Sequence, residues 1–248
     1  MDRKLENKMN MKPELRNIWK NYNQTRISGD KKTANKLLQK YIDILKNENY
    51  SVREEFVDEI CSAVLETKDN IIANNGTEVS DNEYRIQHPL FKEIILPILI
   101  VKYKMNSAQH IKWIGQLEQF FYSDSQISKK FLDEIGIEDY FSTSFFFEKS
   151  FSIDRSQKTL DLLLKRYARD LEYYVHEVPF GVLIEPDIFD EEIKLFETYY
   201  EQFDKKGIWT ARLNEWKLIS LHWRTYLSSR SEYVNFEDYL NRNGIKLE

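Results

Sequence analysis

The sequence predicts an all-α protein, an irregular array of antiparallel helical hairpins with about ten helices around a central apolar helix at residues 90–103. This stretch holds eight consecutive non-polar residues, Ile94 to Val101, and a helix that is apolar on every side must be enclosed by other elements. Apolar residues recur at helical spacing through most of the chain. Seven glycines and five prolines in 248 residues are few for a sheet protein, whose tight turns use both.

The central stretch could be a buried strand or a buried helix, because periodicity does not separate the two over a short run. The apolar pattern continues through Ile111, Trp113 and Ile114, which is too far for one strand. We therefore predict a helix, kinked at Pro97, because proline lacks the backbone N–H and clashes with the preceding turn. We expect this helix to be structural, since it carries no chemically active side chain.

Before the central helix, capping residues mark three helices. Pro13 suits the first turn of a helix. Gly29 is expected to end that helix and Asp30 to cap the next one. Ser51, with Glu54 three residues later, is expected to form a capping box at the start of the third.

After the central helix, the same kinds of residue mark the remaining helices. Ser107 is expected to cap a helix that continues to Phe121, and Gly136 to end the short helix that follows. The helix after Pro186 is expected to be capped by Asp187 or Asp190. This helix is expected to continue through Phe203. Further helices are predicted at residues 140–153, 159–178, 210–229 and 236–243.

Residues 68–83 are polar, asparagine-rich and carry Gly76, which is typical of a linker or a long surface loop. We therefore predict an N-terminal helical hairpin region at 1–67. A C-terminal helical body at 84–248 would contain the central helix. The alternative is one continuous domain with a loop at 68–83.

The composition excludes several classes of protein. Cys61 is the only cysteine, so an internal disulfide and a cysteine-built metal site are impossible, and the chain suits a reducing cytoplasm. The longest apolar run is far short of the ~20 residues that a membrane span needs, and the N-terminus lacks the apolar core of a signal peptide. The net charge of −5 gives no support for nucleic-acid binding. We expect a soluble protein, with Cys61 as a buried thiol rather than a nucleophile.

Catalytic and metal-binding patterns are missing from the sequence, so we predict no catalytic residue, no metal and no cofactor. The four histidines fall in no H-E-x-x-H or Glu-x-x-His arrangement. We interpret them as surface or capping residues. No phosphate-binding glycine pattern and no G-x-S-x-G motif occurs.

An acidic segment at 177–204 is the first candidate for partner binding. It has nine acidic residues against Lys194 alone, whereas residues 1–54 hold thirteen basic and seven acidic residues. Acids are favoured at a helix N-terminus by the macrodipole, but such asymmetry can also steer a charged partner. The candidate partner-binding carboxylates are Glu185, Asp187, Asp190, Glu191, Glu192 and Glu197.

A tryptophan stripe is the second candidate for partner binding. Trp209, Trp216 and Trp223 recur every seven residues, so on a helix they lie almost in one line. Two interpretations are open. The stripe could face the core, or it could form a partner groove, because tryptophan often dominates protein interfaces.

Two segments resemble parts of tetratricopeptide repeats, although the fixed 34-residue period is absent. These segments are Trp19-x-x-Tyr22…Gly29-Asp30…Ala34-x-x-Leu37-Leu38…Tyr41 and Phe146 to Asp154. This resemblance implies stacked helical pairs and an adaptor that binds a peptide. The overall character of the chain also slightly resembles helical bacterial toxin-immunity proteins, without a diagnostic motif.

Three hypotheses on function follow. The first is a non-catalytic cytoplasmic binding protein, most specifically an immunity protein that neutralises a basic bacterial toxin domain through its acidic face. The second is a tetratricopeptide-like adaptor for a peptide or protein partner. The third is a helical enzyme with a carboxylate-based site in the acidic segment.

Overall fold

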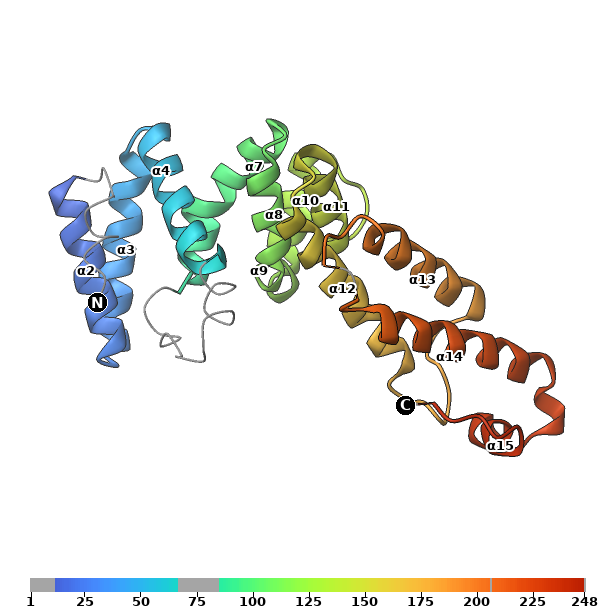
Figure 1. Ribbon diagram of the computed structural model, residues 1–248. Helices are drawn as coiled ribbons and strands as arrows, with labels where there is room; N and C mark the ends of the chain where they lie inside the picture. Colours follow the sequence, from blue (N-terminus) through green and yellow to red (C-terminus); the bar gives the residue numbers. More distant parts are fainter. Residues whose placement is uncertain (1–11, 67–84, 206, 248) are drawn as a thin grey trace. The chain divides into compact units, whose positions relative to one another are not determined.

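The computed structural model describes residues 12–66, 85–205 and 207–247, and every regular element in these ranges is helical (Figure 1). The prediction of an all-α array is therefore confirmed. The chain divides into two compact units, Met1–Ser142 and Thr143–Glu248. No helix in the described ranges is both long and apolar enough to cross a membrane. The predicted loop at 68–83 lies outside the described residues.

Within the described residues, the first unit is built from α-helices and two π-helices. In chain order they are α2 (Pro13–Ile27), α3 (Lys31–Asn47), α4 (Tyr50–Cys61), the π-helix η1 (Ser62–Glu66), α6 (His88–Leu90), the π-helix η2 (Phe91–Ile95), α7 (Leu96–Lys104), α8 (Ala108–Gln116), α9 (Glu118–Ser123) and α10 (Ser125–Ile135). Helices α2, α3 and α4 meet at an aromatic cluster in which the ring of Trp19 lies 4.9 Å from Tyr41 and 5.6 Å from Phe56.

The turn between α2 and α3 follows the prediction. Gly29 has a φ of +88°, which suits a residue without a Cβ, and the Asp30 carboxylate accepts a hydrogen bond from the Thr33 N–H at 3.0 Å. The prediction that Ser51 caps α4 is wrong. Asn49 caps this helix instead, because its side chain already accepts the Val52 N–H at 3.0 Å.

Helices η2 and α7 form the central apolar helix as one continuous run, and the buried-strand alternative is excluded. The backbone N–H of Leu96 bonds to the carbonyl of Phe91, five residues earlier. The widened π turn thus lies directly before Pro97, which has no N–H to give to a regular turn. Ile95 and Leu99 are completely buried.

Two ion pairs of the first unit join segments on the two sides of residues 67–84. Lys46 on α3 bonds to Glu93 on η2 at 2.8 Å, and Lys102 on α7 is paired with Glu54 on α4. The central helix therefore packs with the N-terminal helices α3 and α4 as well as with α8 and α10, which follow it in the chain. An all-apolar helix needs cover on every side, and α3 and α4 supply part of it. The central helix therefore belongs to the same compact unit as α3 and α4, and this unit ends after residue 142.

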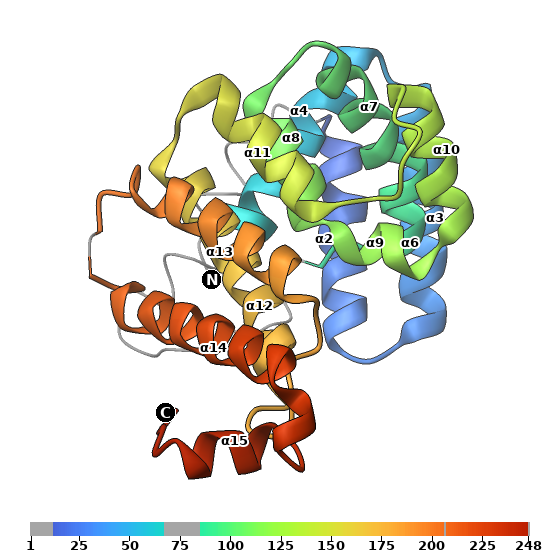
Figure 2. The same ribbon diagram turned by 90° about the vertical axis from the view of Figure 1, so that its right-hand side faces the viewer.

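The second unit consists of two helical hairpins and a short C-terminal helix. Its elements are α11 (Thr143–Asp154), α12 (Gln157–Val175), α13 (Pro186–Tyr200), α14 (Thr210–Ser228), the 3-10 helix η3 (Arg230–Glu232) and α15 (Phe236–Arg242). Helix α13 lies against both α12 and α14 (Figure 2). The core between them is filled by residues such as Leu164, Phe189 and Phe196, all completely buried.

Helix α13 begins earlier than the sequence predicted. Glu185 occupies its N-cap position without a side-chain cap, and Pro186 is the first helical residue. Asp187 therefore lies inside the first turn and Asp190 in the second, so neither caps the helix. Proline favours this start because its fixed φ suits a helix and its missing N–H would be unpaired there in any case.

Candidate functional site

Helix α13 carries five of the six predicted acidic residues, and Glu185 precedes it directly. Phe189, Ile193, Phe196 and Tyr200 form its buried face. The remaining positions divide between two flanks. We call Asp187, Asp190 and Glu197 the α14 flank. We call Ile188, Glu191, Glu192 and Leu195 the α12 flank.

The α14 flank is neutralised within the protein. The Arg224 guanidinium donates to Asp187 at 2.7 Å and to Asp190 at 2.5 Å. The Lys217 ammonium binds Glu197 at 2.5 Å, and the Ser220 hydroxyl also donates to Asp190. Because α14 supplies both cations, half of the predicted acidic surface is already paired. Such exposed pairs add little stability, but they reduce the negative potential of this flank.

The α12 flank is different, because here carboxylates face other carboxylates. Glu192 is half-buried, and its pKa is raised by burial first and then by the charges of Asp170, Glu148 and Glu191. These neighbours come from α12, α11 and α13 itself. Neither Glu191 nor Glu192 forms an ion pair with any residue that the structure describes.

Two groups near the α12 flank moderate this repulsion without removing it. Arg166 binds Asp170 at 2.9 Å within α12. The Tyr167 hydroxyl donates to the Glu148 carboxylate, and burial together with this bond raises the pKa of Tyr167 well above its ordinary value. A proton or an external cation close to Glu192 would therefore be stabilised.

The tryptophan stripe lies mainly in the core. Trp216 is 0% exposed, and its ring packs 5.2 Å from Phe196. Trp209 and Trp223 are partly buried against the same core, and Trp223 lies 5.1 Å from Phe236 of α15. A partner that docks on the surface of the second unit would reach the edges of Trp209 and Trp223 but not Trp216.

Ser107, His110 and Asp58 form a constellation that the sequence analysis missed. The Ser107 hydroxyl lies 2.7 Å from Nδ1 of His110, and Nε2 of His110 lies 2.8 Å from the Asp58 carboxylate. In the sequence, Ser107 and His110 are three residues apart at a predicted helix start, so their side chains could be expected to reach one another. Asp58 is 52 residues from His110, so only the packing of α4 near α8 brings it there.

In chemical terms, Asp58 can orient the imidazole and His110 can accept a proton from Ser107, as in hydrolases with a Ser-His-Asp triad. Two features favour a structural role instead. Ser107 holds the N-cap position of α8, where serine is common, although its hydroxyl bonds to His110 and makes no cap hydrogen bond, contrary to the predicted cap. His110 is buried and packs 4.9 Å from the Trp113 ring. The contact between His110 and Asp58 joins α8 to α4.

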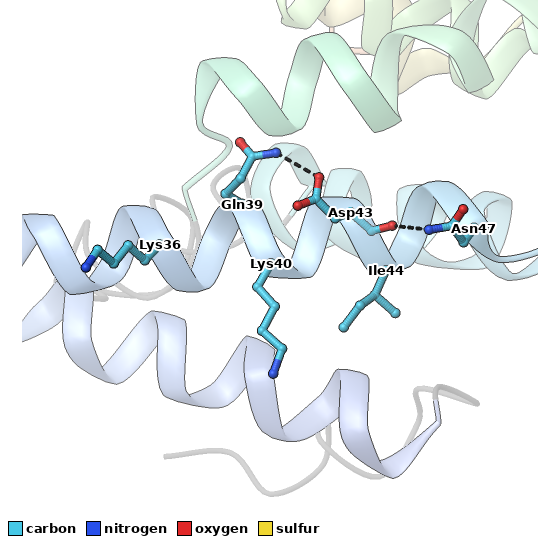
Figure 3. A pocket seen from close by; sticks show the side chains of 6 residues that line it. All are labelled: Lys36, Gln39, Lys40, Asp43, Ile44 and Asn47. Carbon is cyan, nitrogen blue, oxygen red and sulfur yellow. Dashed lines mark hydrogen bonds between the residues drawn. The ribbon is translucent and has the colours of Figure 1, made fainter.

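Three cavities lie away from Glu192 and from the Ser107, His110 and Asp58 contacts. One of about 450 Å³ is lined by side chains of α3 alone, where Gln39 bonds along the helix to Asp43 at 2.9 Å (Figure 3). A second, of about 460 Å³, lies between α12, α14, α15 and the C-terminal residues. A third, of about 560 Å³, lies beside α10 and residues 137–141. Ser107, His110, Asp58 and Glu192 line none of these three.

Within the described ranges, no group of three or more His, Cys, Asp and Glu side chains is arranged to hold a metal ion. Cys61 is completely buried, as predicted. Burial is the main reason that the pKa of its thiol is raised far above the ordinary value, and Asp58 and Glu66 add to the effect. This thiol therefore stays protonated and is a poor nucleophile.

Comparisons with protein-family models, with curated proteins and with solved structures found no match for the chain.

Proposed function

We propose that this protein is a non-catalytic helical binding protein whose second unit recognises a basic protein surface through the α12 flank of α13. The observation that carries this proposal is the set of unpaired carboxylates there. Glu192 lies near Asp170, Glu148 and Glu191, whose charges raise its pKa after burial, and Arg166 is paired with Asp170. The repulsion among these acids would be relieved by lysine or arginine side chains of a partner.

The contrast with the α14 flank supports this proposal. Lys217 and Arg224 neutralise acids on the side where α14 packs. Glu191 has the exposed Lys194 three residues further along α13, but it forms no ion pair with a described residue. A structural need for these carboxylates is not evident on the α12 flank, since they cap no helix and form no ion pair within the described residues. A site that is open to an external cation explains them.

As the most specific form of this function, we propose an immunity protein that neutralises a basic toxin domain of a bacterium. A toxin that acts on nucleic acid needs a basic cleft to hold phosphates. An acidic surface that covers this cleft would associate quickly through electrostatic steering and would exclude the substrate.

The test uses the toxin-like domain encoded next to this gene, if the locus holds one, and a basic nuclease domain from an unrelated locus as the specificity control. Cells that express the toxin domain should survive when this protein is co-expressed, and the two purified proteins should form a complex. Glu191→Lys should weaken the complex about tenfold. Glu138→Lys, an equal charge change at an exposed site of the first unit, should not. Survival without any complex, or a complex that tolerates Glu191→Lys, would refute the proposed function.

A second candidate function, a hydrolase, is favoured by the Ser107–His110–Asp58 contacts alone. Its test is covalent labelling of the purified protein by a fluorophosphonate probe, which reacts with activated serines. Labelling that disappears in Ser107→Ala and in His110→Ala, but persists in Ser123→Ala, would support a hydrolase. No labelling would leave the contacts with a purely structural role.

A further inference from the structure

The α12 flank carries two exposed apolar side chains between and beside its acids. Ile188 is 48% exposed and Leu195 is 36% exposed. They are seven residues apart, so on the helix they project in nearly the same direction, about 10 Å from one another along the axis. Glu191 and Glu192 lie between them, at the third and fourth positions after Ile188. The result is a short apolar stripe interrupted and bordered by carboxylates.

Helix α12 borders this stripe on one side. The helices run antiparallel, because Tyr174 packs 6.4 Å from Phe189 and Tyr167 packs 5.9 Å from Tyr199. Asp170 acts on Glu192 across the contact. Tyr173, three residues beyond Asp170, is 63% exposed. Apolar and acidic groups thus continue from α13 onto α12.

From this combination we infer that the α12 flank of α13, with its border on α12, is the docking site for a basic amphipathic helix of the partner. An amphipathic helix presents apolar side chains at i, i+3 or i+4, and i+7, which matches the two-turn separation of Ile188 and Leu195. Lysine or arginine residues beside that apolar stripe would then meet Glu191 and Glu192. This inference rests on the proposed function and adds the secondary structure and polarity of the partner segment.

A second exposed apolar pair shows why charge decides the choice of site. Leu218 and Leu221 on α14 are 39% and 59% exposed, comparable with Ile188 and Leu195. Their neighbours Lys217 and Arg224 are basic and paired with acids of α13. Near Leu218 and Leu221, a basic helix would meet the cations Lys217 and Arg224 and acids that are already paired. Leu218 and Leu221 therefore serve as the matched control.

The test uses a synthetic peptide of about 20 residues, about 30 Å long as a helix, built from alanine, leucine and lysine. Leucines follow i, i+4, i+7 spacing and lysines flank them. A second peptide has the same composition with the leucines spread around the helix, and a third has glutamate in place of lysine. Binding to the full-length protein is measured by calorimetry, and the helix content of the bound peptide by circular dichroism.

We expect the amphipathic basic peptide to bind and to gain helix content. The spread-leucine and glutamate peptides should bind at least tenfold more weakly, a difference of about 1.4 kcal/mol. The double variant Ile188→Ser/Leu195→Ser should weaken binding about tenfold, and Leu218→Ser/Leu221→Ser should leave it within about twofold. All four positions are partly exposed, so thermal melts should show that both variants remain folded. The comparison among the three peptides needs no variant at all.

Three results would overturn this inference: no binding of the amphipathic basic peptide, equal binding of the spread-leucine peptide, or equal loss in both serine double variants. The outcome is separable from that of the proposed function. If the natural partner binds and Glu191→Lys weakens it while Ile188→Ser/Leu195→Ser does not, the acidic recognition stands and the helix-docking site is wrong. If neither change affects the partner, both proposals fail.

Discussion

Helices α7 and α13 are built from similar numbers of apolar side chains but use them differently. Helix α7 and the π turn before it are buried along most of their length, and Ile95 and Leu99 have no exposed surface. Helix α13 buries one face only, and its two flanks carry acids. On one flank α14 neutralises them, and on the other they remain unpaired. The comparison separates a helix that is enclosed on most sides from one that keeps an exposed flank of unpaired acids, the flank that we propose as the binding surface.

The largest expected effect concerns α7. Leu99→Asp places an unpaired charge in the core of the first unit and should reduce the free energy of unfolding by more than about 4 kcal/mol. Val101 lies two residues away and is 38% exposed, so Val101→Asp should have an effect below about 1 kcal/mol. Urea denaturation followed by circular dichroism measures both. If both variants lost the same free energy of unfolding, the side of α7 that carries Val101 would be as enclosed as the side that carries Leu99.

The next effect concerns the core of the second unit beneath α13. Trp216→Ala removes a completely buried ring that packs on Phe196 and should cost about 3–5 kcal/mol. Trp209→Ala, at a partly buried position, should cost clearly less. Thermal melts of both variants test the ranking. If Trp216→Ala were as stable as the parent protein, the tryptophan stripe would belong to a surface and not to the core.

Glu59 in the first unit and Glu192 in the second are both acids whose pKa is raised mainly by burial. Burial is the main reason that the pKa of Glu59 is raised from 4.5 to about 7, and Glu55 contributes. Because the folded state holds this proton more tightly than the unfolded state, stability should fall as pH rises from about 4.5 to about 7 and should stay level above that. Glu59→Gln cannot ionise, so it should be more stable than the parent at pH 8 by about 1–2 kcal/mol, a value reduced for partial solvent exposure.

Urea midpoints at pH 5 and pH 8 would measure this effect, and Glu138→Gln, at an exposed site of the same unit, provides the control. A stability difference that is the same at both pH values would contradict the raised pKa. For Glu192 the direction is the same, since its pKa is also raised mainly by burial. A basic ligand would favour ionised Glu192, so binding should release protons in mildly acidic buffer, which calorimetry in buffers of different ionisation enthalpy detects.

The smallest effect should come from making the α14 flank resemble the α12 flank. Arg224→Ala removes the cation that pairs with Asp187 and Asp190. Affinity for the basic peptide should rise about twofold to threefold at low salt, with no change at high salt, because the added attraction is long-range and screened. Weaker binding in this variant would mean that Arg224 itself contacts the partner.

Much of the fold could be predicted from sequence because the helical periods and caps are local. Asp30 and Gly29 act as expected, and the helices at 210–229 and 236–243 lie within one residue of their predicted ends. The errors arose where two residues competed for one role. Asn49 rather than Ser51 caps α4, and Pro186 starts α13 before either candidate aspartate. Sequence spacing does not rank competing caps.

The candidate site was only partly accessible from sequence. Counting charge along residues 177–204 identified the acidic helix, but it omitted Lys217 and Arg224, which come from the next helix. Asp170 and Glu148, which act on Glu192, come from earlier helices. Electrostatic interactions depend on distance in space, so a linear count could not distinguish the paired flank from the unpaired one.

The sequence by itself determined that this chain is helical and where most helices begin and end, because these properties follow from 3.6-residue periodicity and local capping. Only the tertiary structure decided that the central helix joins the N-terminal unit, that Asp58 meets His110, and that Glu191 and Glu192 stay unpaired. Each of these depends on residues distant in the chain, and their meeting is set by the packing of whole helices.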